Sequence, residues 1–432
     1  MKSKPKNQKG KKKREVRLAR RKTNREKIQP FDTAINKLNL EIQSLDQTLP
    51  LIETVLTSII TKDSTEINSF ATKFQKGPVK IDDATFDILH ELIRETAIHL
   101  MSKATVREMY LVALITKFDI FLADLLRDIY EIHPEVLVGS EKKISYPDVL
   151  KYSSLTDVKE NIISQEVDEF LRGSITDRFK FLEKISNVKI IEKIDMWPQL
   201  IEISERRNVI IHNNGIASKQ YLEVCKANDV DISSIDLGRS LTIRPEYFAK
   251  ACETFYEAGI ITEQLIRRKI LPKDKDKADI SLRQLSYESL KGEKYNITIQ
   301  ILNLGKKLND YSSEETKCMI LINGAAAYKF HGDKAQCTQL IDDEDWSAKD
   351  DMYKLAICVL KDEFDKALKL MESIPSEKIS EEEYKTWPLF NELRKHPHFQ
   401  DTYKKKFGID FEEKETIPKK LEALRTQIQS LQ

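Results

Sequence analysis

The chain is poor in the residues that interrupt helices and make tight turns. Its 432 residues include only 12 Gly and 13 Pro, whereas 33% are charged and 40% are hydrophobic. Turn-dense β architectures need more Gly and Pro than this, while long helices need little of either. The composition therefore predicts an all-α fold, with enough apolar material for a buried core in two or three domains.

Long apolar runs are also missing. No stretch approaches the roughly 18–20 apolar residues that a membrane span needs, and no apolar segment of a signal peptide follows the basic N-terminus. The cysteines form no C-x-x-C pair, and an odd, scattered set is typical of reduced thiols rather than a disulfide framework. We therefore expect a cytoplasmic protein without membrane contacts. The five cysteines are Cys225, Cys252, Cys318, Cys337 and Cys358.

Motifs for metals and nucleotides are absent as well. His396-Pro397-His398 is the one close histidine pair, and no further ligand lies at a zinc-binding spacing from it. No Gly-rich G-x-x-x-x-G-K loop occurs, so a nucleotidyltransferase or NTPase has no support. The sequence therefore predicts neither a metal nor a cofactor.

Positive charge is concentrated at one end of the chain. Residues 1–28 carry 14 Lys or Arg against Glu15 and Glu26, about +12 in a chain whose net charge is +1. Such a segment has almost nothing to bury, and we expect a disordered basic arm. Its charge favours binding to RNA, ribosomes or DNA, whereas the alternative is a solvated tail that aids solubility. The residues expected to contact RNA are Lys11, Lys12, Lys13, Arg14, Arg17, Arg20 and Arg21.

Residues 29–80 contain a heptad pattern. Apolar side chains recur at alternating spacings of three and four residues, which predicts a helix with an apolar seam. Pro50 lies inside the seam and is expected to kink or split the helix. The seam could pair two chains, but this interruption favours packing on the same chain. Residues 64–80 are expected to form a linker. The seam residues are Ile35, Leu38, Ile42, Leu45, Leu49, Ile52, Leu56 and Ile59.

Residues 81–271 have the pattern of a helical bundle. A core helix is expected from Asp82 to about Tyr130, with a brief interruption around 102–105, and shorter helices follow it. One later helix should open at Pro198, and another should run from about Pro245 to Ile270.

Residues 279–410 contain a repeated pattern, preceded by the KDKDK segment 273–277, which we expect to act as a charged hinge. Three stretches each predict a helix, a polar break and a second helix, with breaks that begin at positions 292, 332 and 364. Recurring helix pairs predict a stacked α-solenoid, similar to tetratricopeptide repeats, and an irregular bundle is the alternative. Residues 411–432 are expected to add a helical tail.

One stretch, SERRNVIIHNNG (204–215), places charged and polar residues among aliphatic ones. On a helix from Pro198, the aliphatic face would consist of Leu200, Ile201, Ile203, Ile210 and Ile211. The outer side would carry Glu202, Glu205, Arg206 and Val209. Arg207 would then fall in the middle of the apolar face, with Asn208 and His212 along its edge.

An unpaired charge in a core costs several kcal/mol, so Arg207 must have a buried partner or face a cleft or interface. Arg, Asn and His together supply a cation, an amide and a group that titrates near neutrality. These groups suffice to cleave RNA without a metal, because a His can move the proton of the attacking 2′-OH while a guanidinium stabilises the phosphorane. Alternatively, Arg207 binds a core carboxylate and His212 caps the helix end near Gly215.

The stretch also resembles a known family. Arg207-Asn208, three residues and His212-Asn213, then Gly215 and Tyr221-Leu222, are similar to the HEPN superfamily, in particular its large bacterial RNase-like branch. The resemblance covers about residues 82–270. It implies an antiparallel helical bundle that dimerises, so that two motifs form one composite endoribonuclease site. It also implies that Arg207 binds phosphate, His212 is the acid or base, and Asn208 orients the site, with Asn213 and Arg206 in support.

The sequence therefore predicts a metal-independent endoribonuclease that acts as a homodimer on RNA. The resemblance implies a role in toxin–antitoxin systems, antiphage defence or RNA processing, and the helical repeats would bind a controlling protein partner. The alternative is a non-catalytic RNA- or ribosome-associated adaptor, which would be favoured if Arg207 and His212 were both sealed in the core with protein partners.

Overall fold

The computed structural model describes residues 30–75, 82–139, 145–149, 151–308 and 310–412. These residues form helices and loops, with a single isolated β-bridge between Ile216 and Ser240. The prediction of an all-α fold, a helical bundle followed by stacked helix pairs, is confirmed. The basic arm, the Gly77-Pro78 dipeptide and residues 413–432 of the predicted tail lie outside the described residues.

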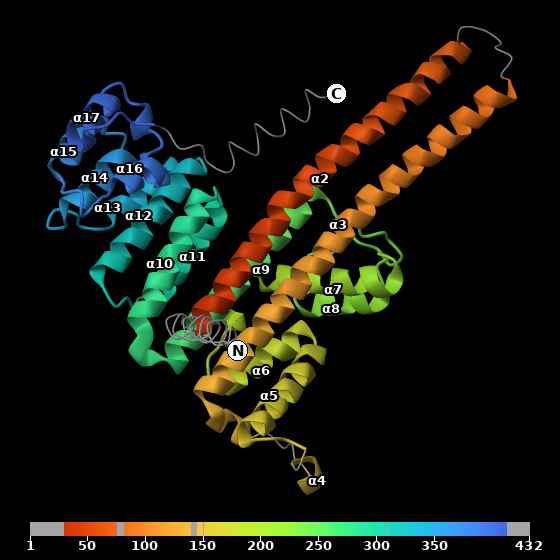
Figure 1. Ribbon diagram of the computed structural model, residues 1–432, viewed down its shortest axis with the longest axis horizontal. Coiled ribbons are helices and arrows are strands. Elements are labelled where there is room, and N and C mark those ends of the chain that lie inside the picture. Colours follow the sequence, from red (N-terminus) through yellow and green to blue (C-terminus); the bar gives the residue numbers. More distant parts are fainter. Residues whose placement is uncertain (1–29, 76–81, 140–144, 150, 309, 413–432) are drawn as a thin grey trace, which may run out of the picture.

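Two long antiparallel helices, α2 (Pro30–Gln75) and α3 (Asp83–Ile132), form a hairpin that projects well beyond the other helices (Figure 1). The heptad seam packs within the chain from Ile35 to Leu49, as expected, whereas Ile52 and Ile59 farther along it are exposed. Pro50 does not split α2, however, and α3 runs through residues 102–105 without a break. Proline has no backbone N–H, so α2 lacks one backbone hydrogen bond at Pro50. Packing of α2 against α3 outweighs that loss. Helix α2 also continues through most of the expected linker.

The core of the bundle is the contact among α2, α3 and α9 (Pro245–Ile270), which is buried along most of its length. Gly259 lets α9 approach α2 closely, because a Cβ there would lie 2.6 Å from Leu38 Cδ2. The rings of Phe118 and Phe255 pack edge to face across α3 and α9, 4.9 Å apart. Helix α2 therefore packs as part of the bundle core. The predicted boundary at 80 had placed it in a segment before the bundle.

The remaining bundle helices lie on the side of the hairpin away from the repeats (Figure 1). Ser174 caps α6 with a reciprocal capping box to Asp177. The elements in this part are η1 (Pro134–Gly139), α4 (Tyr146–Val149), α5 (Leu155–Arg172), α6 (Ile175–Ser186), η2 (Ile191–Lys193), α7 (Trp197–Asn213) and α8 (Lys219–Ala227).

After η3 (Pro272–Asp274), three helix pairs are stacked against the bundle, and short helices close the stack. The pairs are α10 (Lys275–Lys291) with α11 (Tyr295–Leu308), α12 (Glu314–Phe330) with α13 (Lys334–Asp342), and α14 (Asp351–Leu360) with α15 (Phe364–Ser373). The closing elements are α16 (Glu381–Thr386), η4 (Pro388–Phe390), η5 (Leu393–Lys395) and α17 (Phe399–Phe407).

The turns within the three pairs are built alike. Glu293, Gly332 and Asp362 each have a left-handed φ, between 60° and 97°. In each turn the next residue donates its N–H to a carbonyl five residues earlier, at 2.8–2.9 Å, which is the closing bond of a Schellman motif. The third break therefore lies at 361–363 and not at 364–366, because Phe364 already begins α15.

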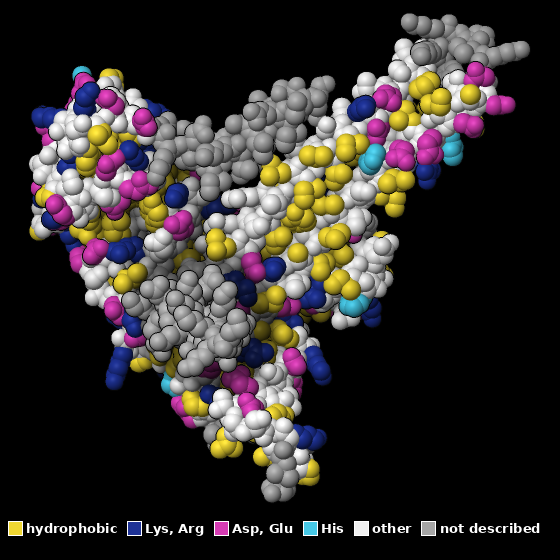
Figure 2. Space-filling view, viewed as in Figure 1, with side chains coloured by type: hydrophobic (Ala, Val, Ile, Leu, Met, Phe, Trp, Pro, Cys, Tyr) yellow, Lys and Arg dark blue, Asp and Glu magenta, His cyan; other side chains and the backbone are white. Residues whose placement is uncertain are grey.

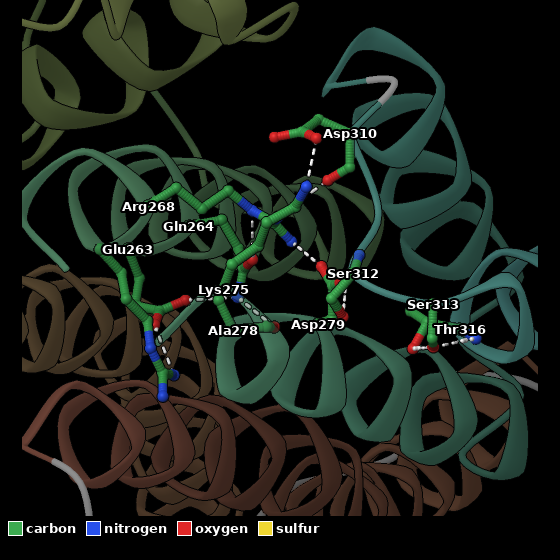
Figure 3. Close-up of polar contacts among 11 residues, drawn as sticks. Glu263, Gln264, Arg268, Lys275, Ala278, Asp279, Asp310, Ser312, Ser313 and Thr316 are labelled. Atoms are coloured by element: carbon green, nitrogen blue, oxygen red, sulfur yellow. Dashed lines mark hydrogen bonds and ion pairs between the residues drawn. The ribbon is translucent and has the colours of Figure 1, made fainter. Parts of the chain in front are cut away.

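The joint between bundle and repeats is a rigid polar contact rather than a hinge. Residues 275–277 of the expected hinge are the first turn of α10. The fully buried Asp279 pairs with Arg268 of α9 and accepts hydrogen bonds from the Ser312 backbone and hydroxyl, the latter at 2.6 Å (Figure 3). One carboxylate thus joins α9, α10 and the loop before α12.

None of the described helices is both long enough and apolar enough to cross a membrane.

We expect Asp279→Ala to lower the free energy of unfolding by about 3–5 kcal/mol, because it leaves Arg268 as an uncompensated charge. The matched control is Asp310→Ala, which removes an exposed carboxylate paired with Lys275 in the same joint and should cost about 1 kcal/mol or less. Urea unfolding followed by circular dichroism measures both. Equal effects would mean that the buried carboxylate does not hold the joint.

Candidate active site

Helix α7 presents the predicted motif at its C-terminal end. Pro198 lies in its first turn, as expected, and the helix ends at Asn213. Asn214 is the left-handed C-cap (φ 49°), and Gly215 follows with φ 72°, so two consecutive residues adopt the left-handed conformation where the helix ends. Gly215 accepts a 2.8 Å hydrogen bond from Leu241 N, which fixes the chain beyond the helix to the segment before α9.

The outer side predicted for α7 is buried against α8 and the start of α9. Glu202 is only 8% exposed and accepts hydrogen bonds from Arg206 Nε (2.7 Å), Tyr221 OH (2.6 Å) and Tyr247 OH (2.7 Å). Burial and the adjacent Glu202 charge raise the pKa of both tyrosines well above the usual value, so they remain donors. This buried polar cluster joins three helices.

Arg206 is therefore not the surface charge that helical geometry suggested. Its guanidinium carbon lies 4.2 Å from the centre of the Tyr247 ring, and its side chain is 11% exposed. Val209 on the same side is buried with Tyr221 and Leu241, whereas Ile211, assigned to the apolar face, is about half exposed. The prediction assumed one buried face, but α7 is packed on two sides.

Arg207 points to a shared carboxylate. Its Nη2 lies 3.8 Å from Asp119 Oδ2 of α3, a long distance for an ion pair, and its side chain is 26% exposed. The other oxygen of Asp119 pairs closely with Arg178 of α6. Arg178 also donates to the carbonyls of Gly173 (3.0 Å) and Leu171 (2.6 Å), so it is the arginine that holds Asp119 in place.

Arg207 retains unused hydrogen-bonding capacity. Its buried Nε has no acceptor among the described residues. Burial raises the pKa of Asp119, and the charges of Arg178 and Arg207 oppose that shift. The close ion pair of Asp119 is with Arg178, so its contact with Arg207 is the weaker of the two. Arg207 thus combines partial exposure, a weak ion pair and an unpaired donor, which suits it to a phosphate ligand.

The other predicted site residues lie on the same helix. Asn208 is half-buried and donates to Glu205 Oε1 at 3.3 Å. His212 is exposed in the last turn. Because Asn214 and Gly215 close the helix, His212 does not act as its cap. Asn213 donates to the carbonyl of Ile216, so its contact stabilises the turn after α7.

Sequence reasoning missed the residues that position Arg207. Asp119 and Arg178 lie 88 and 29 positions earlier in the chain, on different helices, and no local pattern connects them. The sequence contains a weak indication that Glu202 is buried. Glu202, Arg206 and Val209 are spaced by four and three residues, so they lie along a second side of the helix.

Comparison with family models, with curated proteins and with solved structures gives no match to this chain.

The adjacent arginines offer a matched test of this geometry. Arg206→Ala should lower the free energy of unfolding by about 3 kcal/mol, because Glu202 stays buried without its counter-ion. Arg207→Ala should cost about 1 kcal/mol or less, because Asp119 keeps Arg178. Chemical denaturation of the two variants beside wild type measures the difference, and a reversed order would contradict the assignment of Arg206 to the core.

Proposed function

We propose that the protein is a metal-independent endoribonuclease of the HEPN type. The observation that carries this proposal is the state of Arg207: a partly exposed guanidinium with a 3.8 Å ion pair and an Nε without an acceptor, on the same helix as the exposed His212. Both side chains sealed in the core with protein partners would have favoured the adaptor alternative, whereas Arg207 is 26% exposed on its side chain and His212 is exposed.

The proposed reaction needs only proton transfer and charge stabilisation. The ribose 2′-oxygen forms a bond to the adjacent phosphorus while the bond from phosphorus to the 5′-oxygen breaks. The 2′-hydroxyl proton is removed and the 5′-oxygen is protonated, which leaves a 2′,3′-cyclic phosphate and a 5′-hydroxyl. His212 would take or give the proton, and Arg207 would bind the phosphate oxygens as negative charge develops.

Two copies would form the complete site, in which one motif supplies the base and the other the acid. Asn208 would orient the site through its amide. The helical repeats would bind a protein partner that restrains or targets cleavage, in a toxin, antiphage defence or RNA-processing role.

His212→Ala and Arg207→Ala should each lower the cleavage rate by at least about a hundredfold, the lower end expected for a lost general acid or base. Cleavage of a labelled RNA in excess EDTA, with end-group analysis of the products, measures both the rate and the chemistry. His331→Ala, an exposed histidine on the repeats, is the control and should leave the rate unchanged.

The outcome that would overturn the mechanism is activity that chelation abolishes and an added divalent metal restores. Full activity of His212→Ala would remove His212 from the site, and the absence of cleavage by wild type would leave the adaptor alternative.

Deleting residues 1–28 should weaken RNA affinity and flatten its salt dependence, with the turnover rate at saturating RNA unchanged. The arm has about 12 excess positive charges and no His or Cys, so it can neutralise phosphates but cannot act as an acid or base near neutral pH. Titration of full-length and truncated protein at several salt concentrations measures the slope. Identical affinity and slope would make the arm a solubilising tail, and loss of turnover would place it in the active site.

A further inference from the structure

The middle of the α2–α3 hairpin is almost free of charge. Residues 47–61 of α2 and 96–106 of α3, here called the neutral segment, contain Glu53 and Lys103 as their only Asp, Glu, Lys or Arg, in a chain that is 33% charged. Glu53 is buried in an ion pair with Arg107, and Lys103 donates to Thr57 Oγ1 at 2.7 Å. The surface of this segment therefore carries almost no charge that would keep it in water.

Large apolar side chains stand out from the same segment. Each exposes between 36% and 72% of its surface, and the space-filling view shows hydrophobic side chains gathered along the hairpin (Figure 2). A helix that is apolar on more than the side facing its neighbour is normally covered by another element. Within the described residues, nothing covers these side chains: Ile52, Val55 and Ile59 of α2, and Ile98, Leu100 and Met101 of α3.

The α2 residues form a row suited to helix pairing. Ile52, Val55 and Ile59 are separated by three and four residues, so they lie along one side of α2, as in the seam of a coiled coil. They are distinct from the residues that face α3 at this level, such as Leu56 and Ile60, which are half-buried.

We infer that this row is a self-association surface, and that two copies of the chain pair through α2 in antiparallel orientation, with the two-fold axis near Val55. In such a pair Lys62 of one copy lies opposite Thr48 of the other, and Glu66 lies opposite Ser44, so no like charges meet. Equivalent surfaces related by a two-fold axis are the commonest form of oligomer contact.

Continuity of the apolar surface and charge favour a second copy over other occupants. The α2 row is continued on α3 by exposed Ile98, Met101 and Met109, whose spacings of three and eight residues place them along one side of that helix, and a stable interface needs about 800 Å² on each partner. A lipid surface is disfavoured because the outer end of α3 is acidic and anionic headgroups would repel it. Its carboxylates are Asp82, Asp83, Asp87, Glu91 and Glu95.

This inference does not depend on catalysis, since it rests on the hairpin alone.

The test is sedimentation of the full chain carrying Ile52→Glu, Val55→Glu and Ile59→Glu together. Wild type should sediment as a dimer at micromolar concentration, and the triple variant should raise the dissociation constant by at least about a hundredfold. Leu40→Glu is the matched control, because Leu40 is 66% exposed on the same helix but outside the neutral segment. It should remain dimeric. Circular dichroism checks that each variant is folded.

A second variant removes the dependence on folding of the triple mutant. Val55→Cys should form a disulfide-linked dimer on mild oxidation, because a residue on a two-fold axis meets its own copy, whereas Leu40→Cys should not. A monomeric wild type, including one that binds phosphatidylcholine–phosphatidylserine vesicles, would overturn the inference, as would a triple variant that still dimerises. His212→Ala should dimerise like wild type, so loss of the dimer and loss of the proposed activity are separable outcomes.

Discussion

Helix α9 is the element on which the position of every other part depends. It is buried along most of its length, between the α2–α3 hairpin and the repeats. Several of its polar residues bind other elements: Tyr247 donates to Glu202 of α7, Arg267 binds Asp32 of α2, and Arg268 binds Asp279 of α10. Because an uncompensated charge at such depth is costly, these contacts allow one arrangement of the bundle and the repeats.

The same constraint explains why the two neighbouring arginines differ. Arg206 is drawn into the cluster around Glu202, where two tyrosine hydroxyls and an aromatic face complete its surroundings. Arg207 faces the opposite side, where Arg178 already holds Asp119. Asp119 is shared between the two guanidinium groups, and the charge of Glu205 also acts on Arg207, but Arg207 Nε has no acceptor among the described residues. An anion could supply that acceptor.

Features set by short-range patterns could be predicted from the sequence. These include the helical class, the seam of α2 from Ile35 to Leu49, the start of α3 at Asp82 and the paired helices after residue 275. Predictions failed where a distant segment decided the outcome. Pro50 stays helical because α3 supports α2, Glu202 is buried because Tyr221 and Tyr247 reach it, and KDKDK is no hinge because Asp279 binds Arg268. The third repeat turn was misplaced because its left-handed residue is Asp362 and not glycine.

The site and the hairpin each leave a different kind of group without a partner. At the site, the buried Nε of Arg207 has no acceptor among the described residues, and an unpaired donor lowers stability unless a ligand completes it. On the hairpin, apolar side chains from Ile52 to Ile59, about two turns of α2, have no covering element, and such a surface lowers solubility unless another surface covers it. Neither the unpaired donor nor the uncovered apolar side chains find a partner elsewhere in the described fold. A phosphate at Arg207 and a second copy at Val55 would each relieve one of them, so substrate binding and assembly are separable properties of one helical scaffold.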